Sequence, residues 1–317
     1  MPSALCSLLV MNGIVVVNKP EGLSSARAVA RVKRLLQVRK AGHTGTLDPF
    51  ARGVLVCCLN QATRLAGFLL RSPKTYEGVL TLGVETDTQD ATGRIISERD
   101  GTAVAEQDLL RIFQGYEGAY SQTPPVYSAL KHGGVPLYAL VRRGRAVQKP
   151  ARPVFIYRIR VLAIERPRVR FEVRCSAGTY IRTLCADIGR DAGCGGHLSE
   201  LTRLESGGFT LDDALTPEAL EDRVRHGTAS QAVIPMARAL PEVPAVVADL
   251  PVREKVSTGR PLAVEDLDVE KAIPAWTADG GRLLKLIDPH GELLAVLEYV
   301  PGSSMLGYRC VFARPQR

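Results

Sequence analysis

The stretch Arg168-Val169-Arg170-Phe171-Glu172-Val173-Arg174-Cys175 alternates strictly between charged and apolar residues. Successive side chains of a strand point to opposite faces of a sheet, so this pattern predicts a strand with one face on a core and one face in water. A turn at 176–178 follows, and then apolar residues recur at helical spacing until Gly193. The spacing predicts a helix over 179–192 that packs against the same core.

Similar patterns on either side of this unit predict further elements. Strands are expected at 14–17 and 77–84, and a strand or another short buried element at 54–59. Helices are expected at 24–36, with Ser24 as N-cap, and at 102–113. The segment 121–153 is rich in proline, glycine and basic residues, which is typical of an excursion from a core. Three prolines in 241–251 predict a linker, and strands expected at 283–287, 292–300 and 308–313 predict a small β-rich domain after it.

Composition narrows the class of protein. The chain has 317 residues, 45% hydrophobic and 23% charged, which predicts about two globular domains and excludes a disordered or fibrous chain. No apolar run approaches the ~18 residues that a membrane helix needs. The seven cysteines are scattered, which favours a reducing cytoplasm, and Cys194 with His197 supplies only two of the four ligands of a structural zinc site. We therefore expect a cytoplasmic protein without a metal.

The basic residues are concentrated in one segment. The chain carries a formal charge of +8, and residues 131–174 alone hold twelve Lys and Arg against two Glu. An excess confined to one segment indicates a surface for a polyanion such as nucleic acid. Charge alone leaves open the alternative of a solvated face that keeps the protein soluble.

A glycine-containing loop at 41–49 holds the first candidate for chemistry. Asp48 precedes Pro49, which disfavours the helical conformation for it, and Gly42 and Gly45 allow another group to approach the backbone closely. A loop with one fixed carboxylate often holds a reacting group. The loop by itself favours the simpler interpretation, an aspartate that caps the next turn.

Five motifs resemble those of one family. The chain resembles the TruB family of tRNA pseudouridine synthases in motifs that follow in order between about residues 12 and 210: Asn18-Lys19-Pro20-x-Gly22, Gly42-His43-Thr44-Gly45-Thr46-Leu47-Asp48-Pro49, Lys74-Thr75-Tyr76, Tyr127-Ser128-Ala129-Leu130-Lys131 and Gly178-Thr179-Tyr180-Ile181-Arg182-Thr183-Leu184. Three departures concern details of RNA contact only: Ala177 stands in place of a lysine, Arg52 in place of a small residue, and Ser24-Ser25-Ala26-Arg27 differs from the commoner sequence.

The resemblance implies a cofactor-free isomerase and assigns catalytic residues. Members convert a uridine in the T-arm loop of tRNA, at tRNA position 55, into pseudouridine. Asp48 matches the catalytic aspartate, and whether it attacks C1′, attacks the base or removes a proton stays open. Arg182 is expected to pair with Asp48, Tyr180 to handle the C5 proton, and Asp90 to join an aspartate–arginine network. On residues alone, Asp90 equally suits a solvated turn.

The resemblance also assigns residues that contact the RNA. Tyr76 would stack on the flipped base and Leu201 would line its pocket, although each could be an ordinary core residue. His43 matches a residue that fills the space vacated in the RNA loop. The RNA backbone would be held by cationic side chains at Lys19, Lys131, Arg142, Arg143 and Arg145.

The expected fold is α+β: a mixed, largely antiparallel sheet with flanking helices and a central catalytic cleft, followed by a small β-rich domain. We place the catalytic domain at 12–245, with an RNA-gripping insertion at about 121–153, and a PUA-like domain at 250–317. The expected partner is tRNA, bound by a monomer. Two alternatives remain: a tRNA-folding chaperone that needs no catalysis, and a guide-RNA-dependent pseudouridine synthase.

Overall fold

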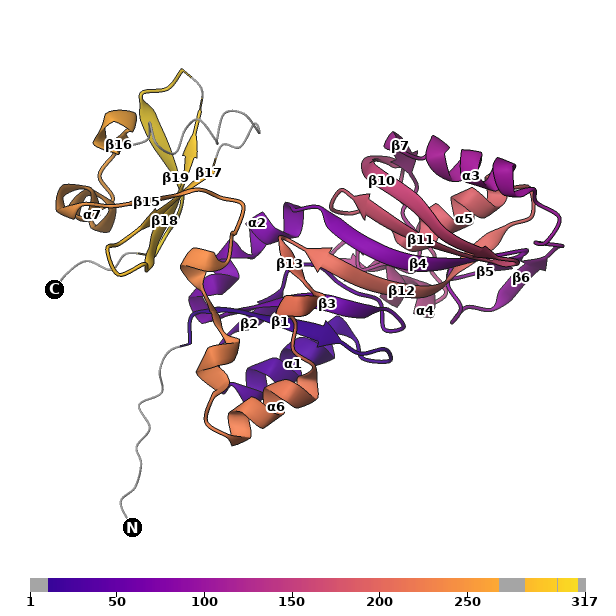
Figure 1. Cartoon of the computed structure of the whole chain (residues 1–317), viewed down its shortest axis with the longest axis horizontal. Helices are drawn as coiled ribbons and strands as arrows, with labels where there is room; N and C mark the ends of the chain where they lie inside the picture. The colour runs from indigo at the N-terminus through magenta and orange to yellow at the C-terminus, as the bar shows by residue number, and fades with distance from the viewer. Residues whose placement is uncertain (1–10, 268–282, 301, 313–317) are drawn as a thin grey trace, which may run out of the picture.

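The computed structural model describes residues 11–267, 283–300 and 302–312. Parts of the predicted C-terminal domain, at 268–282 and 313–317, therefore lie outside the described residues. Within the described residues, no helix is both long enough and apolar enough to cross a membrane. The architecture is α+β, as predicted, with one large sheet and one small sheet (Figure 1).

The large sheet has ten strands in the order β14-β1-β3-β12-β4-β11-β10-β7, with β2 paired to β3 and β13 paired to β12. All neighbours are antiparallel except β3 and β12. Its strands are β1 (Gly13–Lys19), β2 (Ala41–His43), β3 (Arg52–Leu59), β4 (Lys74–Leu82), β7 (Gly118–Gln122), β10 (Arg152–Glu165), β11 (Arg168–Cys175), β12 (Gly196–Ser206), β13 (Phe209–Thr210) and β14 (Ile234–Pro235).

Helices flank this sheet and the small one. The α-helices are α1 (Ser25–Leu35), α2 (Ala66–Arg71), α3 (Glu106–Gly115), α4 (Leu137–Arg142), α5 (Ile181–Asp191), α6 (Pro217–Arg225) and α7 (Leu250–Ser257). Short 3₁₀ helices are η1 (Asn60–Leu65), η2 (Leu211–Asp213), η3 (Ala229–Ala232), η4 (Met236–Arg238) and η5 (Val264–Asp266). The predicted N-cap of the first helix is confirmed, because the Ser24 side chain accepts a hydrogen bond from the Arg27 N–H.

The strand predicted at 168–175 is confirmed as β11, with the expected division of its faces. Val169, Phe171, Val173 and Cys175 are buried in one core with apolar residues of α3 and α5, while the arginines between them are exposed. The same half of the sheet contains β4, β7, β10 and β12. We call this part, with its two helices, the α5 lobe.

The other half is built around β1, which is apolar on both faces. Val15 and Val17 pack with residues of α1 and α6, whereas Ile14 and Val16 pack with residues of η1, α2 and the small C-terminal sheet. The continuous apolar run at 14–17 therefore corresponds to a strand that is buried on both faces. We call β1, β2, β3 and β14 with α1 and α6 the α1 lobe (Figure 1).

The two lobes join along a short parallel contact between β3 and β12. Only two residue pairs form its register, Thr202 with Arg52 and Arg203 with Gly53. Gly53 has φ +106°, and a Cβ there would lie 2.2 Å from the Arg203 carbonyl oxygen. Both the positive φ and the lack of space for a Cβ require glycine at this position.

The small sheet has the order β15-β17-β18-β19-β16, with strands β15 (Ala245–Val247), β16 (Leu262–Ala263), β17 (Leu283–Ile287), β18 (Leu293–Tyr299) and β19 (Met305–Val311). The predicted β-rich C-terminal domain is confirmed by these strands. The linker predicted at 241–251 is wrong, because this stretch carries β15 and the start of α7. Its prolines are compatible with both elements, since Pro251 lies in the first turn of α7 and β15 is an edge strand.

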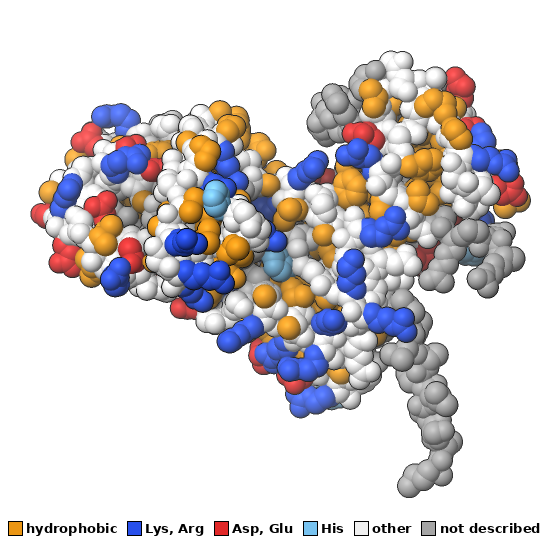
Figure 2. All heavy atoms as spheres, turned by 180° about the vertical axis from the view of Figure 1, so that it is seen from behind, with side chains coloured by type: hydrophobic (Ala, Val, Ile, Leu, Met, Phe, Trp, Pro, Cys, Tyr) orange, Lys and Arg blue, Asp and Glu red, His pale blue; other side chains and the backbone are white. Residues whose placement is uncertain are grey.

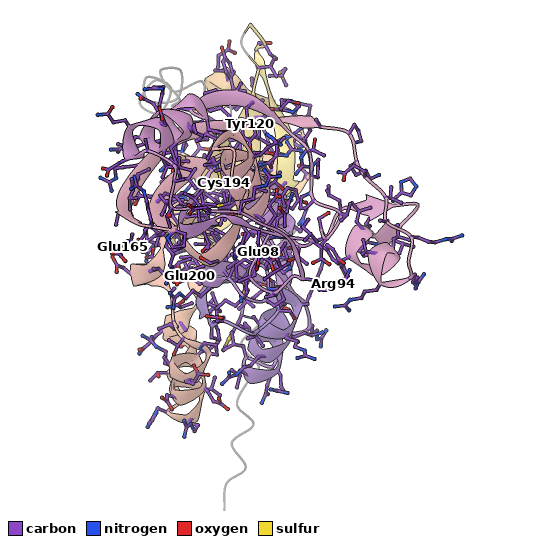
Figure 3. All side chains as sticks on the ribbon, turned by 90° about the vertical axis from the view of Figure 1, so that its right-hand side faces the viewer. Arg94, Glu98, Tyr120, Glu165, Cys194 and Glu200 are labelled. Atoms are coloured by element: carbon purple, nitrogen blue, oxygen red, sulfur yellow. The ribbon has the colours of Figure 1, made fainter. Side chains whose placement is uncertain are left out.

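The segment between β7 and β10 leaves the large sheet, as predicted. It contains α4 and a hairpin of β8 (Lys131–His132) and β9 (Val135–Pro136). A second hairpin, β5 (Val84–Thr86) and β6 (Ile95–Glu98), lies between β4 and α3. In the end-on view of Figure 3, the ribbon of the insertion stands apart on the right, while Glu165 and Glu200 lie on the left, across the sheet.

Candidate active site

A cavity of about 450 Å³ opens where the two lobes meet. The α1 lobe contributes the loop Gly45–Asp48, which connects β2 to β3, and the α5 lobe contributes most of the other walls. Four predicted site residues line it together with Asp48: Tyr76, Tyr180, Arg182 and Leu201. The volume lies within the usual range for ligand pockets.

Asp48 is presented to this cavity by a loop that is fixed on both sides. The buried Ser25 hydroxyl, on the first residue of α1, accepts from the Leu47 N–H at 2.8 Å and donates to the Leu47 carbonyl at 2.9 Å. On the other side of Asp48, the Lys19 ammonium contacts the Pro49 carbonyl at 3.3 Å. The Asp48 side chain remains 34% exposed, so it is both held in place and accessible.

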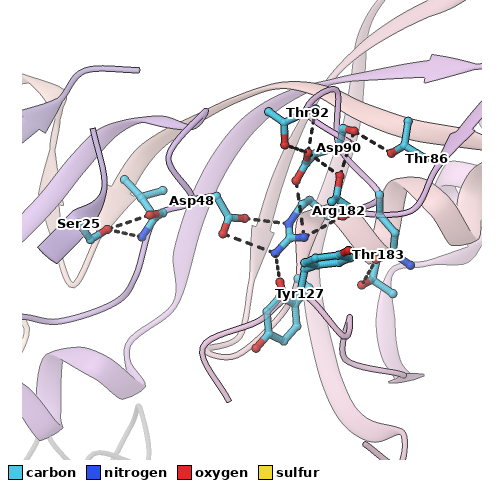
Figure 4. A network of polar contacts seen from close by, with 12 residues as sticks. Ser25, Asp48, Thr86, Asp90, Thr92, Tyr127, Arg182 and Thr183 are labelled. Atoms are coloured by element: carbon cyan, nitrogen blue, oxygen red, sulfur yellow. Dashed lines mark hydrogen bonds and ion pairs between the residues drawn. The ribbon is translucent and has the colours of Figure 1, made fainter. Parts of the chain in front are cut away.

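Arg182 forms the predicted ion pair with Asp48. Its Nε donates to Asp48 Oδ2 at 2.8 Å, and its guanidinium also lies 3.6 Å from Asp90 Oδ2 (Figure 4). The remaining donors reach the carbonyls of Thr88 and Tyr127, each at 2.8 Å. The side chain is only 4% exposed. A buried guanidinium with this many partners has one orientation, and the Asp48 carboxylate is aligned with it.

Asp90 belongs to this network and is not a solvated turn residue. Its Oδ1 accepts hydrogen bonds from the Thr88 and Thr92 hydroxyls at 2.8 and 2.6 Å and from the Thr92 N–H at 3.0 Å. The residue is 4% exposed, and its backbone pairs with Leu198 of β12. Asp90 reaches the cavity only through Arg182, so its place is that of a positioning group.

The two tyrosines approach the cavity from different elements. Tyr76 lies on β4, is 9% exposed, and has a hydroxyl pKa raised by burial. Tyr180 is the N-cap residue of α5, and the Arg152 guanidinium lies 5.4 Å from the centre of its ring. Leu201 of β12 adds an apolar wall that is 7% exposed. An aromatic, partly apolar wall of this kind can stack on a planar base.

His43 lies at the end of β2, next to the loop and outside the cavity lining. Its Nδ1 accepts a hydrogen bond from the Gly45 N–H at 3.3 Å. Burial, followed by the charge of Arg203, lowers the pKa of the His43 imidazole. Both effects favour the neutral form of the His43 imidazole.

Lys19 corrects one prediction. The residue is 0% exposed, and its ammonium donates to the carbonyls of Pro20 and Leu23 at 2.9 and 2.7 Å besides that of Pro49. Burial lowers its pKa to about 8. A buried ammonium with three carbonyl partners cannot contact an RNA backbone, and its contacts instead join β1 to the loop that carries Asp48.

The other four predicted backbone contacts are exposed. Lys131 lies on the β8–β9 hairpin, Arg142 and Arg143 at the end of α4, and Arg145 directly after it. Within the described residues, none of these four side chains has a carboxylate within 4.0 Å. Figure 2, which shows the side of the molecule behind Figure 1, has Lys and Arg side chains gathered over the middle of that face.

Sequence reasoning missed three polar residues of the site. Arg203, 1% exposed, donates to the carbonyls of Val54 at 2.7 Å and Gly45 at 3.1 Å, and so joins β12 to the Asp48 loop. Arg152 donates to the Gly178 carbonyl. Gln122, 0% exposed, pairs with the backbone of Tyr180. No spacing marks these residues, because each acts through a backbone group distant in sequence.

Comparison with known proteins identifies the family. The model of the TruB family pseudouridylate synthase (N terminal domain) matches residues 33–181, and that of the tRNA pseudouridylate synthase B C-terminal domain matches 182–241. The chain is 40% identical to tRNA pseudouridine synthase B of Syntrophotalea carbinolica over 92% of this chain and 93% of that protein. This chain belongs to the TruB family.

Further similarities support this membership of the TruB family. The tRNA pseudouridine synthase B of Geobacillus kaustophilus is 46% identical over 78% of this chain and 90% of that protein. Among solved structures, a Cbf5–Nop10–Gar1 complex matches with a TM-score of 0.73 and 28% identity, covering 96% of this chain and 86% of the other. An H/ACA RNP bound to a substrate RNA matches with a TM-score of 0.70 and 26% identity, with coverage of 96% and 86%. The fold and the family of the chain are therefore those of a pseudouridine synthase.

Proposed function

We propose that this pseudouridine synthase acts on tRNA and converts the uridine at position 55, in the T-arm loop, into pseudouridine. The observation that carries the proposal is the Asp48 carboxylate, which is accessible in a cavity between two tyrosines and held by a buried arginine. The names of the similar TruB proteins supply the class of RNA. The proposed position within the tRNA rests on the resemblance of the chain's motifs to those of the family.

The reaction exchanges one bond of the nucleotide for another. The N1–C1′ bond breaks, the base turns, and a C5–C1′ bond forms, while C5 loses a proton and N1 gains one. Atoms and electrons balance without an oxidant, a reductant or water, and so we propose that no cofactor takes part. Asp48 acts on the nucleotide by attack on C1′, by attack on the base, or by removal of a ribose proton; its single carboxylate suits each route.

The cavity accepts the uridine only after it leaves the RNA stack. Flipping a nucleotide costs a few kcal/mol, and stacking on an aromatic side chain returns about 1–3 kcal/mol. We assign that stacking to Tyr76, which lines the cavity from β4, with Leu201 on the neighbouring strand. Tyr180 also lines the cavity, and we assign it to the transfer of the C5 proton.

The exposed cations of the insertion are assigned to the RNA backbone. Lys131, Arg142, Arg143 and Arg145 have no carboxylate partner among the described residues, so their charge is available to phosphates. We propose that the C-terminal β-rich domain is PUA-like and contacts the acceptor arm. In this arrangement the chemistry stays in the cleft, and the affinity for tRNA is spread over surfaces outside it.

The proposal is tested with the purified full-length chain and an unmodified tRNA transcript, without guide RNA or added protein. Pseudouridine is mapped by chemical labelling and primer extension. We expect product at position 55 from the wild type, and none from Asp48→Asn, which keeps the side-chain volume and loses the charge. Asp48→Asn is expected to bind the transcript within about twofold of wild type, since affinity comes from the backbone contacts.

Other outcomes would point to the alternatives. Product that forms only when a guide RNA is added would indicate a guide-dependent enzyme. Accelerated folding of tRNA with no product from the wild type would indicate a chaperone. Full activity in Asp48→Asn would remove the aspartate from the mechanism while leaving the enzyme class intact.

A further inference from the structure

Gln122 is a buried polar residue beside the cleft that the proposed mechanism does not use. It is the last residue of β7, where the chain enters the insertion, and it is 0% exposed. Its Oε1 accepts from the Tyr180 N–H at 2.8 Å, and its Nε2 donates to the Tyr180 carbonyl at 3.0 Å. One side-chain amide therefore pairs with both backbone groups of one residue that lies 58 positions away.

Tyr180 needs such a partner because of where it lies. It precedes the first residue of α5, its backbone is extended (φ −98°, ψ 111°), and its own side chain makes no capping bond. Its carbonyl accepts the first helical bond, from the Leu184 N–H at 3.0 Å, but its N–H has no partner within the helix. An N–H that is left without a partner beside a cleft would destabilise the start of the helix. The Gln122 amide fills the role that a neighbouring strand would otherwise take.

The amide is itself held in a single orientation. Nε2 also contacts the Tyr120 hydroxyl, two residues earlier on β7. Burial raises the pKa of the Tyr120 hydroxyl, so Tyr120 stays protonated across the physiological range. Both amide hydrogens and the carbonyl oxygen of Gln122 thus have partners, and a fully satisfied buried amide rigidifies its neighbours.

The same end of the insertion touches the catalytic helix a second time. The Tyr127 carbonyl, five residues beyond Gln122, accepts from Arg182 Nη2 at 2.8 Å. Tyr180 and Arg182, which flank the start of α5, are thus each bonded to the start of the insertion. The insertion therefore contributes to the geometry of the catalytic helix as well as carrying exposed cations.

We propose that Gln122 is a positioning residue for the reaction: it fixes the backbone of Tyr180, and with it the start of α5 from which Arg182 reaches Asp48. This inference rests on the proposed function. It assigns to the insertion a role in catalysis that is separate from holding RNA. A displacement of a reacting group by about 1 Å can cost on the order of 10²-fold in rate, so a loss at this position should appear in the chemical step.

The test is Gln122→Glu, which replaces the side-chain NH₂ group by an oxygen and keeps the shape of the side chain. As a carboxylate, the new side chain accepts from the Tyr180 N–H but repels the Tyr180 carbonyl; once protonated, its O–H donates to that carbonyl as the amide did. Burial will raise the pKa of this glutamic acid above its ordinary ~4.3. Lowering the pH should therefore restore the donor and rescue the variant, which a purely structural lesion would not do.

The measurement is the single-turnover rate on unmodified tRNA, with enzyme in saturating excess, between pH 5.5 and 8.5. Relative to wild type at the same pH, we expect Gln122→Glu to be about 30-fold slower at pH 8.5 and about 3-fold slower at pH 5.5. Affinity for the tRNA should stay within about 2-fold. Gln122→Met, which has no donor to regain, should be slow at every pH.

Gln114→Glu is the matched control, because Gln114 is an exposed residue of α3 away from the cleft. It should follow the wild type at every pH. A Gln122→Glu profile parallel to that of the wild type, or a Gln122→Met variant that keeps its native melting temperature and the wild-type rate, would overturn the positioning role. A wild type without turnover would instead refute the proposed function, so the two failures are distinguishable.

Discussion

The two faces of the α5 lobe use arginine in different ways. On the face that borders the cleft, Arg182 is buried and bonded to the Asp48 carboxylate, and four exposed cations of the insertion have no carboxylate partner within the described residues. On the opposite face, three of the exposed arginines of β10 and β11 form ion pairs with glutamates. Arg160 lies 3.6 Å from Glu172, Arg174 lies 3.1 Å from Glu205, and Arg168 contacts Glu200.

Ion pairs cancel part of the charge that the sequence concentrates in residues 131–174. The alternation of β11 sends its arginines to the face opposite the cleft, where glutamates of β11 and β12 pair with Arg160, Arg168 and Arg174. Exposed ion pairs of this kind stabilise a protein by about 0–1 kcal/mol, so their main effect is to cancel charge. The four cations of the insertion, in contrast, have no such partner within the described residues.

The largest difference in reaction rate between variants of the two faces is expected when an arginine is replaced by lysine. Arg182→Lys keeps the charge but loses the planar group that serves Asp48 and two carbonyls together, and the single-turnover rate should fall about 10²-fold. Arg174→Lys, on the opposite face, should stay within about 2-fold of wild type. Equal rates for the two variants would show that the buried guanidinium does not align the aspartate.

A smaller contrast is expected in the salt dependence of tRNA binding. Replacing Arg142, Arg143 and Arg145 together by glutamine should reduce the log–log slope of affinity against salt by about 0.7–0.9 for each phosphate that the variant no longer neutralises, and weaken binding by about tenfold at physiological salt. The matched triple, with glutamine at Arg160, Arg168 and Arg174, removes the same charge. The slope of log affinity against log salt concentration for this second variant should change by less than about one. A larger change would show that RNA also contacts the face opposite the cleft.

The smallest effect concerns the buried lysines of the cleft side. Burial lowers the pKa of Lys74 to about 8, and its ammonium donates to the carbonyls of Leu70 and Ser72. Below pH 8, Lys74 is protonated in both the folded and the unfolded chain. Between pH 8 and the pKa of about 10.4 in the unfolded chain, the unfolded chain binds more protons than the folded chain. Lys74 therefore makes the free energy of unfolding rise with pH over this interval.

Lys74→Met should remove this contribution. Urea unfolding of wild type and variant at pH 7.5 and 9.5 measures it, and the wild type should gain more stability, or lose less, over that interval. Lys131→Met removes an exposed lysine and should leave the difference between the two pH values unchanged. A Lys74 variant with the wild-type pH dependence would mean that this ammonium is not held in a medium that disfavours its charge.

Much of the fold could be predicted from periodicity, and the errors have physical causes. β11, α1 and α5 were predicted because each has one apolar face whose period is that of its element. The stretch at 241–251 was predicted wrongly because proline was taken as a mark of a linker, whereas an edge strand and a first helical turn both accept it.

The site residues that belong to recognisable motifs could be predicted from the sequence. The residues that act by bonding to backbone groups could not. The cavity gathers Asp48, Tyr76, Tyr180, Arg182 and Leu201, all named from the resemblance to the family. Lys19 belongs to a motif too, but its burial could not be inferred from a lysine in a loop. Gln122 and Arg203 bond to carbonyls and N–H groups, which every residue has, so the sequence contains no pattern that could pair them with their partners.

The narrow contact between β3 and β12 has a consequence for how the chain can evolve. The acid comes from one lobe and its guanidinium partner from the other, and the lobes share only two paired positions of backbone, one of them a glycine whose side-chain space is filled. The C-terminal sheet and the hairpin of the insertion can vary in length without moving this pair apart, whereas the start of the insertion is bonded to Arg182 and cannot shift freely. A change at this junction would alter the width of the cleft directly. We therefore expect evolution to change residues and lengths far from the junction more readily than the few backbone contacts that set the distance between Asp48 and Arg182.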